Sequence, residues 1–252
     1  MTTRDWDANT YDRVADPMTR WGGLVLDRLP LAGDERVLDA GCGTGRVTEA
    51  LLERLPSGRV IALDGSPSMI EGARKRLARF GDRVEFLVAD LGRPIPIDGA
   101  VDAILSTATF HWVPDHDAMF ANIAAVLRPG GLLVAQCGGV GNIANVQRVL
   151  TSIGDGWLGP VHFETPAATA ERLSAAGFSD IECWLTDEPT RFEPGEPFET
   201  YLRTVVLGAH LERLPEADRD AFVQAVADGL DEPVIDYVRL NIVARRSVSR
   251  GP

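Results

Sequence analysis

The sequence predicts an α/β fold built on a mainly parallel sheet. Two observations lead to this prediction. Short apolar runs alternate with amphipathic stretches along the first 140 residues, which is the order of repeated βαβ units. A glycine-rich turn follows the first apolar run and opens the next helix, as in sheets that bind a ligand at the carboxyl ends of parallel strands. The chain of 252 residues has the size of one large domain.

The first predicted elements follow one another in a regular order. An amphipathic helix over 17–29 precedes the sheet. The apolar runs then predict five strands, at 36–40, 59–63, 84–88, 101–106 and 132–136. Helices are expected over 47–55, from Pro67 onward and over 118–127, and a turn is expected at 128–131.

After residue 138 the alternation breaks. Two helices and two strands are expected there, the helices at 142–153 and 166–176 and the strands at 181–185 and 239–244. Apolar faces at helical spacing fill the stretch before the last strand. We predict a single domain with four parts: an N-terminal helical segment (1–30), a ligand-binding core (31–140), the remainder of the sheet (141–190 and 237–252) and a helical lid insertion (191–236).

Composition and charge exclude several kinds of partner. The chain has 37 acidic residues against 25 lysines and arginines, a net charge of −12, which leaves no surplus of cations to bind nucleic acid or an anionic membrane surface. No stretch approaches the roughly 20 apolar residues of a membrane span. The three scattered cysteines form no disulfide framework. We therefore expect a cytoplasmic protein that binds neither nucleic acid nor membrane.

The strongest motif is the run Asp39-Ala40-Gly41-Cys42-Gly43-Thr44-Gly45, between a predicted strand and a predicted helix. Its glycines leave backbone N–H groups and the helix N-terminus open to a ligand. A dinucleotide-binding loop needs glycine at its sixth place, and that place is Arg46 or Thr48 here, depending on the glycine counted first. A phosphate loop needs Gly-Lys-Ser/Thr, which is absent. The run therefore predicts a ligand without a pyrophosphate.

Two aspartates end the next two predicted strands. Asp64 lies 19 residues after Gly45, where a carboxylate can accept both hydroxyls of a ribose. Asp90 follows the strand at 84–88 and can accept from an adenine amino group, and Met69 is a natural apolar cover for the base. Either aspartate alone also suits a helix cap or a turn. Two of them at successive strand ends beside a glycine loop favour an adenosine pocket.

Taken together, these segments resemble the ordered motifs of class I S-adenosylmethionine-dependent methyltransferases. The motifs are the glycine run, Asp64-Gly65-Ser66-Pro67-Ser68-Met69, Ala89-Asp90-Leu91 and Leu127-Arg128-Pro129-Gly130-Gly131. The resemblance covers roughly 37–136. It implies a Rossmann-like sheet, mostly parallel with an antiparallel last strand, and S-adenosyl-L-methionine as the cofactor. Segments 6–16, 110–116 and 239–246 are similar to the trans-aconitate methyltransferase family in particular.

The resemblance also implies which residues contact the cofactor. The glycines would flank its methionine and ribose, and Asp90 and Leu91 would meet its adenine. Ser106 and Thr107 would lie beside the methionine part, and Tyr11 would close over the cofactor from the N-terminal segment. The expected cofactor-binding residues are Tyr11, Asp39, Gly41, Gly43, Gly45, Asp64, Gly65, Ser66, Met69, Ala89, Asp90, Leu91, Ser106 and Thr107.

His111 is the candidate catalytic residue. A sulfonium methyl group is already activated, so its transfer needs mainly positioning and exclusion of water. A carboxylate acceptor is ionised at neutral pH and needs no base, whereas a hydroxyl acceptor usually needs one, and His111 is then placed to serve. The alternative is a structural histidine that fixes the loop after the fourth strand. The spacing of His111 and His116 does not fit a zinc site, so no metal is expected.

The acceptor is expected to depend on the lid insertion. Trans-aconitate carries three carboxylates and would need converging arginines. The lid insertion has 11 acidic residues and four arginines, of which Arg191 and Arg203 are the two that could point inward. Its apolar faces fit a more hydrophobic acceptor about as well.

We therefore predict a methyltransferase that acts on a small-molecule acceptor and forms a methyl ester or ether at oxygen, as a monomer or homodimer. One alternative is a nucleic-acid methyltransferase. The acidic charge disfavours it, as does the run 106–109, Ser-Thr-Ala-Thr, in place of an Asn/Asp-Pro-Pro-Tyr/Phe motif. The other alternative is a protein that binds S-adenosylmethionine without catalysis, because binding and turnover are separate properties.

Overall fold

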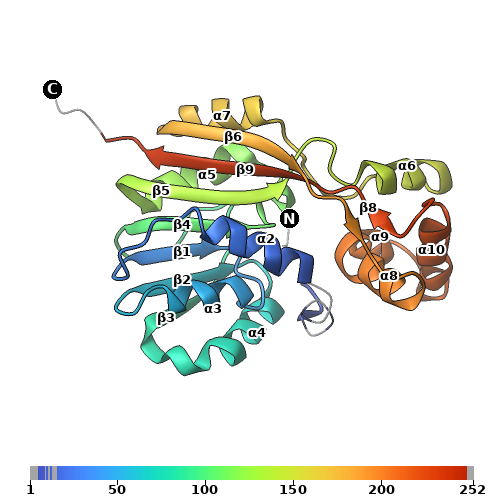
Figure 1. The fold of residues 1–252 in the computed structure, drawn as a ribbon, viewed down its shortest axis with the longest axis horizontal. Coiled ribbons are helices and arrows are strands. Elements are labelled where there is room, and N and C mark those ends of the chain that lie inside the picture. The colour runs from blue at the N-terminus through green and yellow to red at the C-terminus, as the bar shows by residue number, and fades with distance from the viewer. Residues whose placement is uncertain (1–4, 9, 11, 13–15, 249–252) are drawn as a thin grey trace.

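The computed structural model describes residues 5–8, 10, 12 and 16–248, and a seven-stranded sheet forms its centre (Figure 1). The strand order is β3-β2-β1-β4-β5-β9-β6. Strand β9 runs antiparallel to β5 and β6, and the other neighbours are parallel. The strands are β1 (Arg36–Ala40), β2 (Arg59–Asp64), β3 (Val84–Val88), β4 (Val101–Thr107), β5 (Leu127–Gly138), β6 (Phe178–Asp187) and β9 (Val238–Arg246). The predicted fold class is confirmed.

Helices cover both faces of the sheet. One face packs against α2 (Asp16–Leu26), α3 (Arg46–Glu53) and α4 (Pro67–Leu77), and the other against α5 (His116–Val126) and α7 (Pro166–Ala175). Three of these helices begin at polar caps that accept a backbone N–H, at Ser66, Asp115 and Thr165. Among the described residues, no helix is both long enough and apolar enough to cross a membrane.

The predicted turn at 128–131 is wrong, because it forms part of β5. Strand β5 pairs with β4 at Leu127, and the pairing resumes at Leu132 after a break in register. Gly130 takes a left-handed φ of 77° inside this irregular stretch, and Gly131 fits closely, since a Cβ there would lie 2.8 Å from the carbonyl oxygen of Asp102. The Pro-Gly-Gly run therefore makes a bulge rather than a loop.

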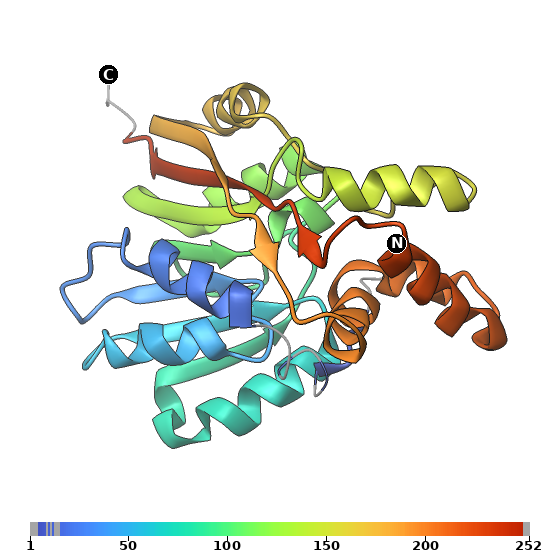
Figure 2. The same ribbon diagram turned by 45° about the vertical axis from the view of Figure 1, so that its right-hand side comes forward.

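The lid insertion forms a separate helical layer beyond the carboxyl ends of the parallel strands (Figures 1 and 2). It consists of β7 (Thr190–Arg191), α8 (Glu196–Tyr201), a π-helical turn (Leu202–Val206), α9 (Gly208–Glu212), α10 (Glu216–Asp228) and β8 (Val234–Ile235). Strands β7 and β8 pair with each other and so join the two ends of the insertion.

The lid insertion packs on elements from outside its own range. Helix α6 (Ala144–Ile153) contributes Val146 and Leu150 to an apolar cluster with Val223 and Val226 of α10. Trp21, from α2, belongs to the same cluster and is buried. The lid insertion is thereby fixed against the helix that precedes the sheet as well as against α6.

Candidate functional site

The glycine loop lies at the carboxyl end of β1. Gly41, Gly43 and Gly45 have φ angles of 90°, 54° and 83°, in the left-handed region that favours glycine. A Cβ added at Gly43 would meet nothing within 4 Å, so a ligand can approach the backbone there. At Gly41 a Cβ would lie 2.0 Å from Oγ1 of Thr109. Close packing against the chain that follows β4 therefore requires glycine at this position.

Asp64 ends β2 and connects the glycine loop to the start of α4. Its carboxylate oxygens accept from the backbone N–H of Gly43 and of Ser66, each at 2.9 Å. Burial raises the pKa of Asp64, and backbone hydrogen bonds from Ser66, Gly43 and Gly65 oppose that rise. A carboxylate has about four lone-pair sites, so these backbone donors leave capacity for a donor from a ligand. The geometry suits an acceptor of two hydroxyl hydrogens beside Gly43.

The end of β3 extends the same edge of the sheet. Asp90 is exposed, and its Oδ1 accepts from the backbone N–H of Gly92 at 2.8 Å. The neighbouring Leu91 is buried, as is Met69 at the start of α4. The backbone N–H of Ala89 donates to the carbonyl oxygen of Asp64 at 3.1 Å, which holds the two strand ends together. The structure thus brings the predicted residues of β1, β2 and β3 to one edge.

Asp39 is placed beneath the glycine loop and not in front of it. Its side chain is fully buried on β1, where Oδ2 accepts from Oγ1 of Thr48 on α3 at 2.6 Å. Its Oδ1 has no hydrogen-bond partner among the described residues. Burial raises the pKa of Asp39 to about 7, and the charge of Asp64 adds to the rise. Asp39 joins α3 to β1 and so supports the loop from below.

The residues at the end of β4 also form a support. Ser106 is buried, and its hydroxyl donates to the carbonyl oxygen of Ala40 at 2.6 Å. Thr109 donates through Oγ1 to the carbonyl oxygen of Thr107 at 2.9 Å. Between them Ala108 has a φ of 55°, which is uncommon for a residue with a side chain. This tight turn directs the chain from Thr107 toward His111.

His111 is buried in a short 3₁₀ turn (Phe110–Trp112), and its ring has a defined tautomer. The backbone N–H of Gly138 donates to Nδ1 of His111 at 3.2 Å. Burial, and with it the positive charge of Arg239, lowers the pKa of His111 well below its usual value. The neutral ring therefore carries its proton at Nε2, where it is a hydrogen-bond donor.

His116 has a different hydrogen-bond partner. Its Nε2 lies 2.9 Å from the carbonyl oxygen of Phe110, at the start of α5. Within the described parts of the chain, no three His, Cys, Asp or Glu side chains are grouped as a metal ion would need.

An N-terminal strap, defined here as residues 5–8, 10 and 12, crosses the site. The carboxylate of Asp12 accepts from Thr44 of the glycine loop and from Arg46, both at 2.8 Å, and from Arg76 of α4 at 2.7 Å. The ring of Trp6 lies 5.3 Å from that of Trp112, edge to face. The strap is thus attached to the glycine loop and to the residue after His111. Tyr11, a predicted cofactor contact, lies outside the described residues.

Arg239 is a buried cation near His111 that the sequence-based prediction did not single out. Of the lysines and arginines that the structure describes, it alone is buried, with 2% of its surface exposed. Its guanidinium lies 4.7 Å above the ring of Trp21, and its Nε lies 3.4 Å from Oε1 of Gln136. The signal was present as a cation in an otherwise mainly apolar closing strand.

The lid arginines do not converge on the site. Arg191 pairs with Glu232 and Arg203 with Asp220, each at 2.6 Å and on the surface. Inward-pointing positions for these two arginines, which the sequence left open, are therefore wrong. Acidic side chains of the lid insertion lie near these arginines and form ion pairs with them. The pairs are exposed to solvent, so their charges do not have to be desolvated.

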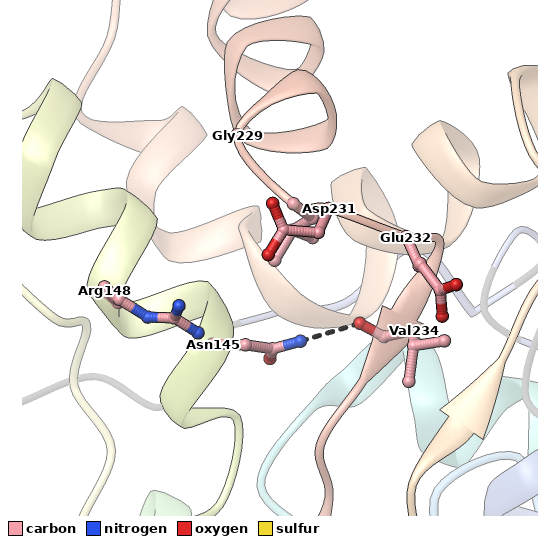
Figure 3. A pocket seen from close by; sticks show the side chains of 7 residues that line it. Asn145, Arg148, Gly229, Asp231, Glu232 and Val234 are labelled. Carbon is pink, nitrogen blue, oxygen red and sulfur yellow. Dashed lines mark hydrogen bonds between the residues drawn. The ribbon is translucent and has the colours of Figure 1, made fainter.

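A hollow of about 270 Å³ lies within the helical layer and apart from this edge (Figure 3). It is lined by Asn145, Arg148, Gly229, Leu230, Asp231, Glu232 and Val234. Asn145 donates to the carbonyl oxygen of Val234 at 2.8 Å across it. A second hollow, of about 470 Å³, lies between the strap and the helices α3 and α4, and Thr44 is among its lining residues. The second hollow therefore borders the glycine loop, and the first does not.

Known proteins with similar sequences are methyltransferases. A family model described as a methyltransferase domain matches residues 37–131. The chain is 30% identical to a trans-aconitate 2-methyltransferase of Methylobacterium radiotolerans, over 96% of this chain and 99% of that protein. It is 36% identical to the protein of the same name from Methylobacterium nodulans, over 72% of this chain and 67% of that one.

A solved structure shows the same fold. It is a phosphoethanolamine N-methyltransferase from Haemonchus contortus, in complex with phosphomonomethylethanolamine and S-adenosylhomocysteine. The TM-score is 0.65 at 19% identity, and the match covers 95% of this chain and 56% of that chain.

Proposed function

We propose that this chain, which belongs to the trans-aconitate 2-methyltransferase family, methylates a carboxylate oxygen of a small molecule to form a methyl ester. The chain is an S-adenosylmethionine-dependent methyltransferase, and its cofactor supplies a methyl group already activated by a positively charged sulfur. The residues of the site then have to bind and orient the acceptor and exclude water from it.

The hydrogen bond from Gly138 to His111 is the observation that carries the proposal. As a general base His111 would have to take the proton at Nδ1, whose lone pair accepts from Gly138, or at Nε2 in the other tautomer, which would place a hydrogen on Nδ1 against that N–H. Either route gives up the bond to Gly138. A hydroxyl acceptor needs a group that takes its proton, whereas a carboxylate needs only donors that hold it. A neutral Nε2–H is such a donor, so the site favours a carboxylate, and the predicted general-base role of His111 is not favoured.

The cofactor assignment is supported by features of the glycine edge. The open space above Gly43 accommodates a ligand against the backbone, and the remaining lone pairs of Asp64 suit ribose hydroxyls. Exposed Asp90 and buried Met69 suit the polar edge and the apolar face of an adenine. In this proposal Asp39 and Ser106 position the loop instead of touching the cofactor.

The proposal is tested by transfer of a tritiated methyl group to a panel of carboxylates, phenols and amines. We expect label in carboxylate products, and we expect mild alkali to release it as methanol, because esters hydrolyse there and ethers and amines do not. Label that resists alkali, or that appears only in phenols or amines, would contradict carboxylate methylation.

We expect the strap to slow the release of the cofactor. Asp12→Asn removes the charge that Arg46 and Arg76 contact and leaves neutral hydrogen bonds in place, a loss of about 1.4 kcal/mol in all. The dissociation rate of S-adenosylmethionine, followed by stopped-flow fluorescence, should rise roughly tenfold. Asp7→Asn is the matched control in the same strap, since Asp7 accepts from the neighbouring backbone N–H of Thr10. Equal rates for Asp12→Asn and the wild type would show that the strap does not retain the cofactor.

Three further properties belong to the proposal. They are the four-part division of the domain, a cytoplasmic location and a monomeric or homodimeric state, all of them expectations from the sequence. Free cysteines at 42, 137 and 183 suit a reducing compartment. Sedimentation equilibrium checks the oligomeric state.

A further inference from the structure

We infer that the connecting segment, defined here as residues 155–164 between α6 and α7, positions the ring of His111 and joins it to the lid insertion. Phe163 and Trp157 are the positioning residues, one toward each end of the segment. The inference rests on the proposed role of His111 as a donor to the acceptor carboxylate. It assigns to a second part of the chain the control of where that donor points.

The backbone of the connecting segment is bound to the residues around His111. The N–H of His162 donates to the carbonyl oxygen of His111 at 2.8 Å, and the N–H of Val140 donates to the carbonyl oxygen of Glu164 at 3.0 Å. Glu164 and Gly139 form an isolated parallel β-bridge. This end of the segment therefore runs beside the chain that leaves β5.

Phe163 packs against the ring of His111. Their ring centres lie 5.8 Å apart, with an angle of 36° between the ring planes. A Cβ at Gly138 would lie 2.7 Å from Cε1 of Phe163, so the glycine that donates to Nδ1 of His111 also makes room for the phenyl ring. The ring of Trp112 lies 5.1 Å from that of His111. Gly138, Phe163 and Trp112 thus surround one imidazole.

These contacts determine the direction of Nε2–H. The torsion that turns a histidine ring about its last side-chain bond has only a broad, roughly two-fold preference, so the surroundings have to fix it. The N–H of Gly138 holds one edge of the His111 ring, and Phe163 limits the movement of the ring plane. An acceptor that binds to Nε2–H is therefore oriented by both residues.

The other end of the connecting segment is attached to the lid insertion. The guanidinium of Arg213 lies 4.1 Å above the ring of Trp157 and pairs with Asp155 at 2.9 Å. The ring of His210, a buried residue of α9, lies 4.7 Å from that of Trp157. Nε2 of His210 is also 3.1 Å from the carbonyl oxygen of Trp157. An ion pair, ring packing and a hydrogen bond thus hold this end.

The span between the two attachments is short. Four residues separate Trp157 from His162, and each supplies only two soft backbone torsions. Pro160 removes one of these torsions. Gly159 has a φ of 92°, and a Cβ there would lie 3.2 Å from a histidine ring of α9. With so few free torsions, we expect a displacement of α9 to move the residues that hold the His111 ring.

The first test observes His111 directly in the complex with S-adenosylhomocysteine. In protein labelled with 15N at histidine, Nε2–H of His111 should give a slowly exchanging NMR signal, assigned by its absence in His111→Phe. Phe163→Leu should raise the rate at which this proton exchanges with water about tenfold, because the ring is freed to open toward solvent. Trp157→Ala, at the far end of the segment, should raise the rate roughly fivefold.

Two further variants complete this test. Leu158→Ala is the matched control, since Leu158 lies in the same segment with 38% of its surface exposed, and it should exchange at the wild-type rate. Arg213→Gln removes the guanidinium from Trp157 at the surface and decides the matter if Trp157→Ala does not fold. An unchanged exchange rate in Phe163→Leu, or in the lid-end variants, would overturn the inference.

The second test asks whether the connecting segment acts through His111. Transfer is measured with the carboxylate that the wild type methylates fastest in the panel. Trp157→Ala should lower kcat about tenfold, because a mobile donor holds the acceptor in a reactive orientation for less of the time. The dissociation constant of S-adenosylhomocysteine should stay within about twofold of the wild type. In a His111→Phe background, Trp157→Ala should lower kcat no further, because effects that pass through one residue are not additive.

The outcomes separate this inference from the proposed function. An equal loss of kcat in both backgrounds would overturn the inference, since the segment would then act by another route. So would a joint fall in thermal stability and in affinity for S-adenosylhomocysteine with no change in the exchange of Nε2–H, which is the result of a purely structural role. If His111→Phe left transfer to carboxylates unchanged, the proposed role of His111 would be wrong, and the exchange rates would still decide whether the segment holds its ring.

Discussion

Asp64→Ala should weaken the binding of S-adenosylmethionine about a hundredfold. The variant loses an acceptor for two ribose hydroxyls, and each hydrogen bond to a charged group contributes about 1.5 kcal/mol. It also loses the link between the backbone N–H groups of Gly43 and Ser66, so the glycine loop is less well ordered before the cofactor arrives. Isothermal titration calorimetry measures the dissociation constant directly.

Two further variants separate these contributions. Asp64→Asn keeps one acceptor oxygen and should show an intermediate affinity. Asp82→Ala removes an exposed aspartate outside the site and should bind like the wild type. If Asp64→Ala stayed within threefold of the wild type, the ribose contact assigned to Asp64 would be wrong.

Asp39→Asn should remove a large part of the pH dependence of stability. The pKa of Asp39 is raised to about 7 in the folded protein, against an ordinary value near 3.9 in the unfolded chain. Between these two values the folded state binds the extra proton, so the free energy of unfolding falls as the pH rises. The fall amounts to roughly 4 kcal/mol at most and is complete just above pH 7.

Urea unfolding at pH 5 and pH 8 measures this difference. Between these pH values the wild type should lose about 2 to 3 kcal/mol of stability through the ionisation of Asp39, and Asp39→Asn should not show this loss. Asp98→Asn, at an exposed position, is the control for the loss of one charge. If the free energy of unfolding changed between pH 5 and pH 8 by the same amount in Asp39→Asn as in the wild type, Asp39 would already be ionised at pH 5.

The sequence predicts the strands and helices around the glycine loop well, because its signals there are local. A strand, a glycine turn and a helix are consecutive in 36–53, and the spacing from Gly45 to Asp64 is set by one βα unit. The Pro-Gly-Gly run in β5 was misread because the same residues make a turn or a bulge, and β4 decides between them. Where the outcome depends on a neighbouring strand, local patterns are ambiguous.

The acceptor half depends on contacts between distant residues. The tautomer of His111 is set by Gly138, 27 positions later, and Arg239 comes near His111 only through the pairing of β5 with β9. The packing of Trp21 against Tyr237 joins two ends of the chain. No periodicity in the sequence reports such pairings, so the sequence shows Arg239 only as a cation in a mainly apolar strand and does not show what it packs against.

The short pairing of β7 with β8 has a consequence for the evolution of this enzyme. Thr190 lies opposite Ile235 and Arg191 opposite Val234, so the chain leaves and re-enters the sheet domain at one place. A foreign segment whose ends are similarly close can be exchanged there without moving β6 or β9, because lengthening a closed loop costs little. Changes of length within the lid insertion therefore leave the ends of β6 and β9 in place.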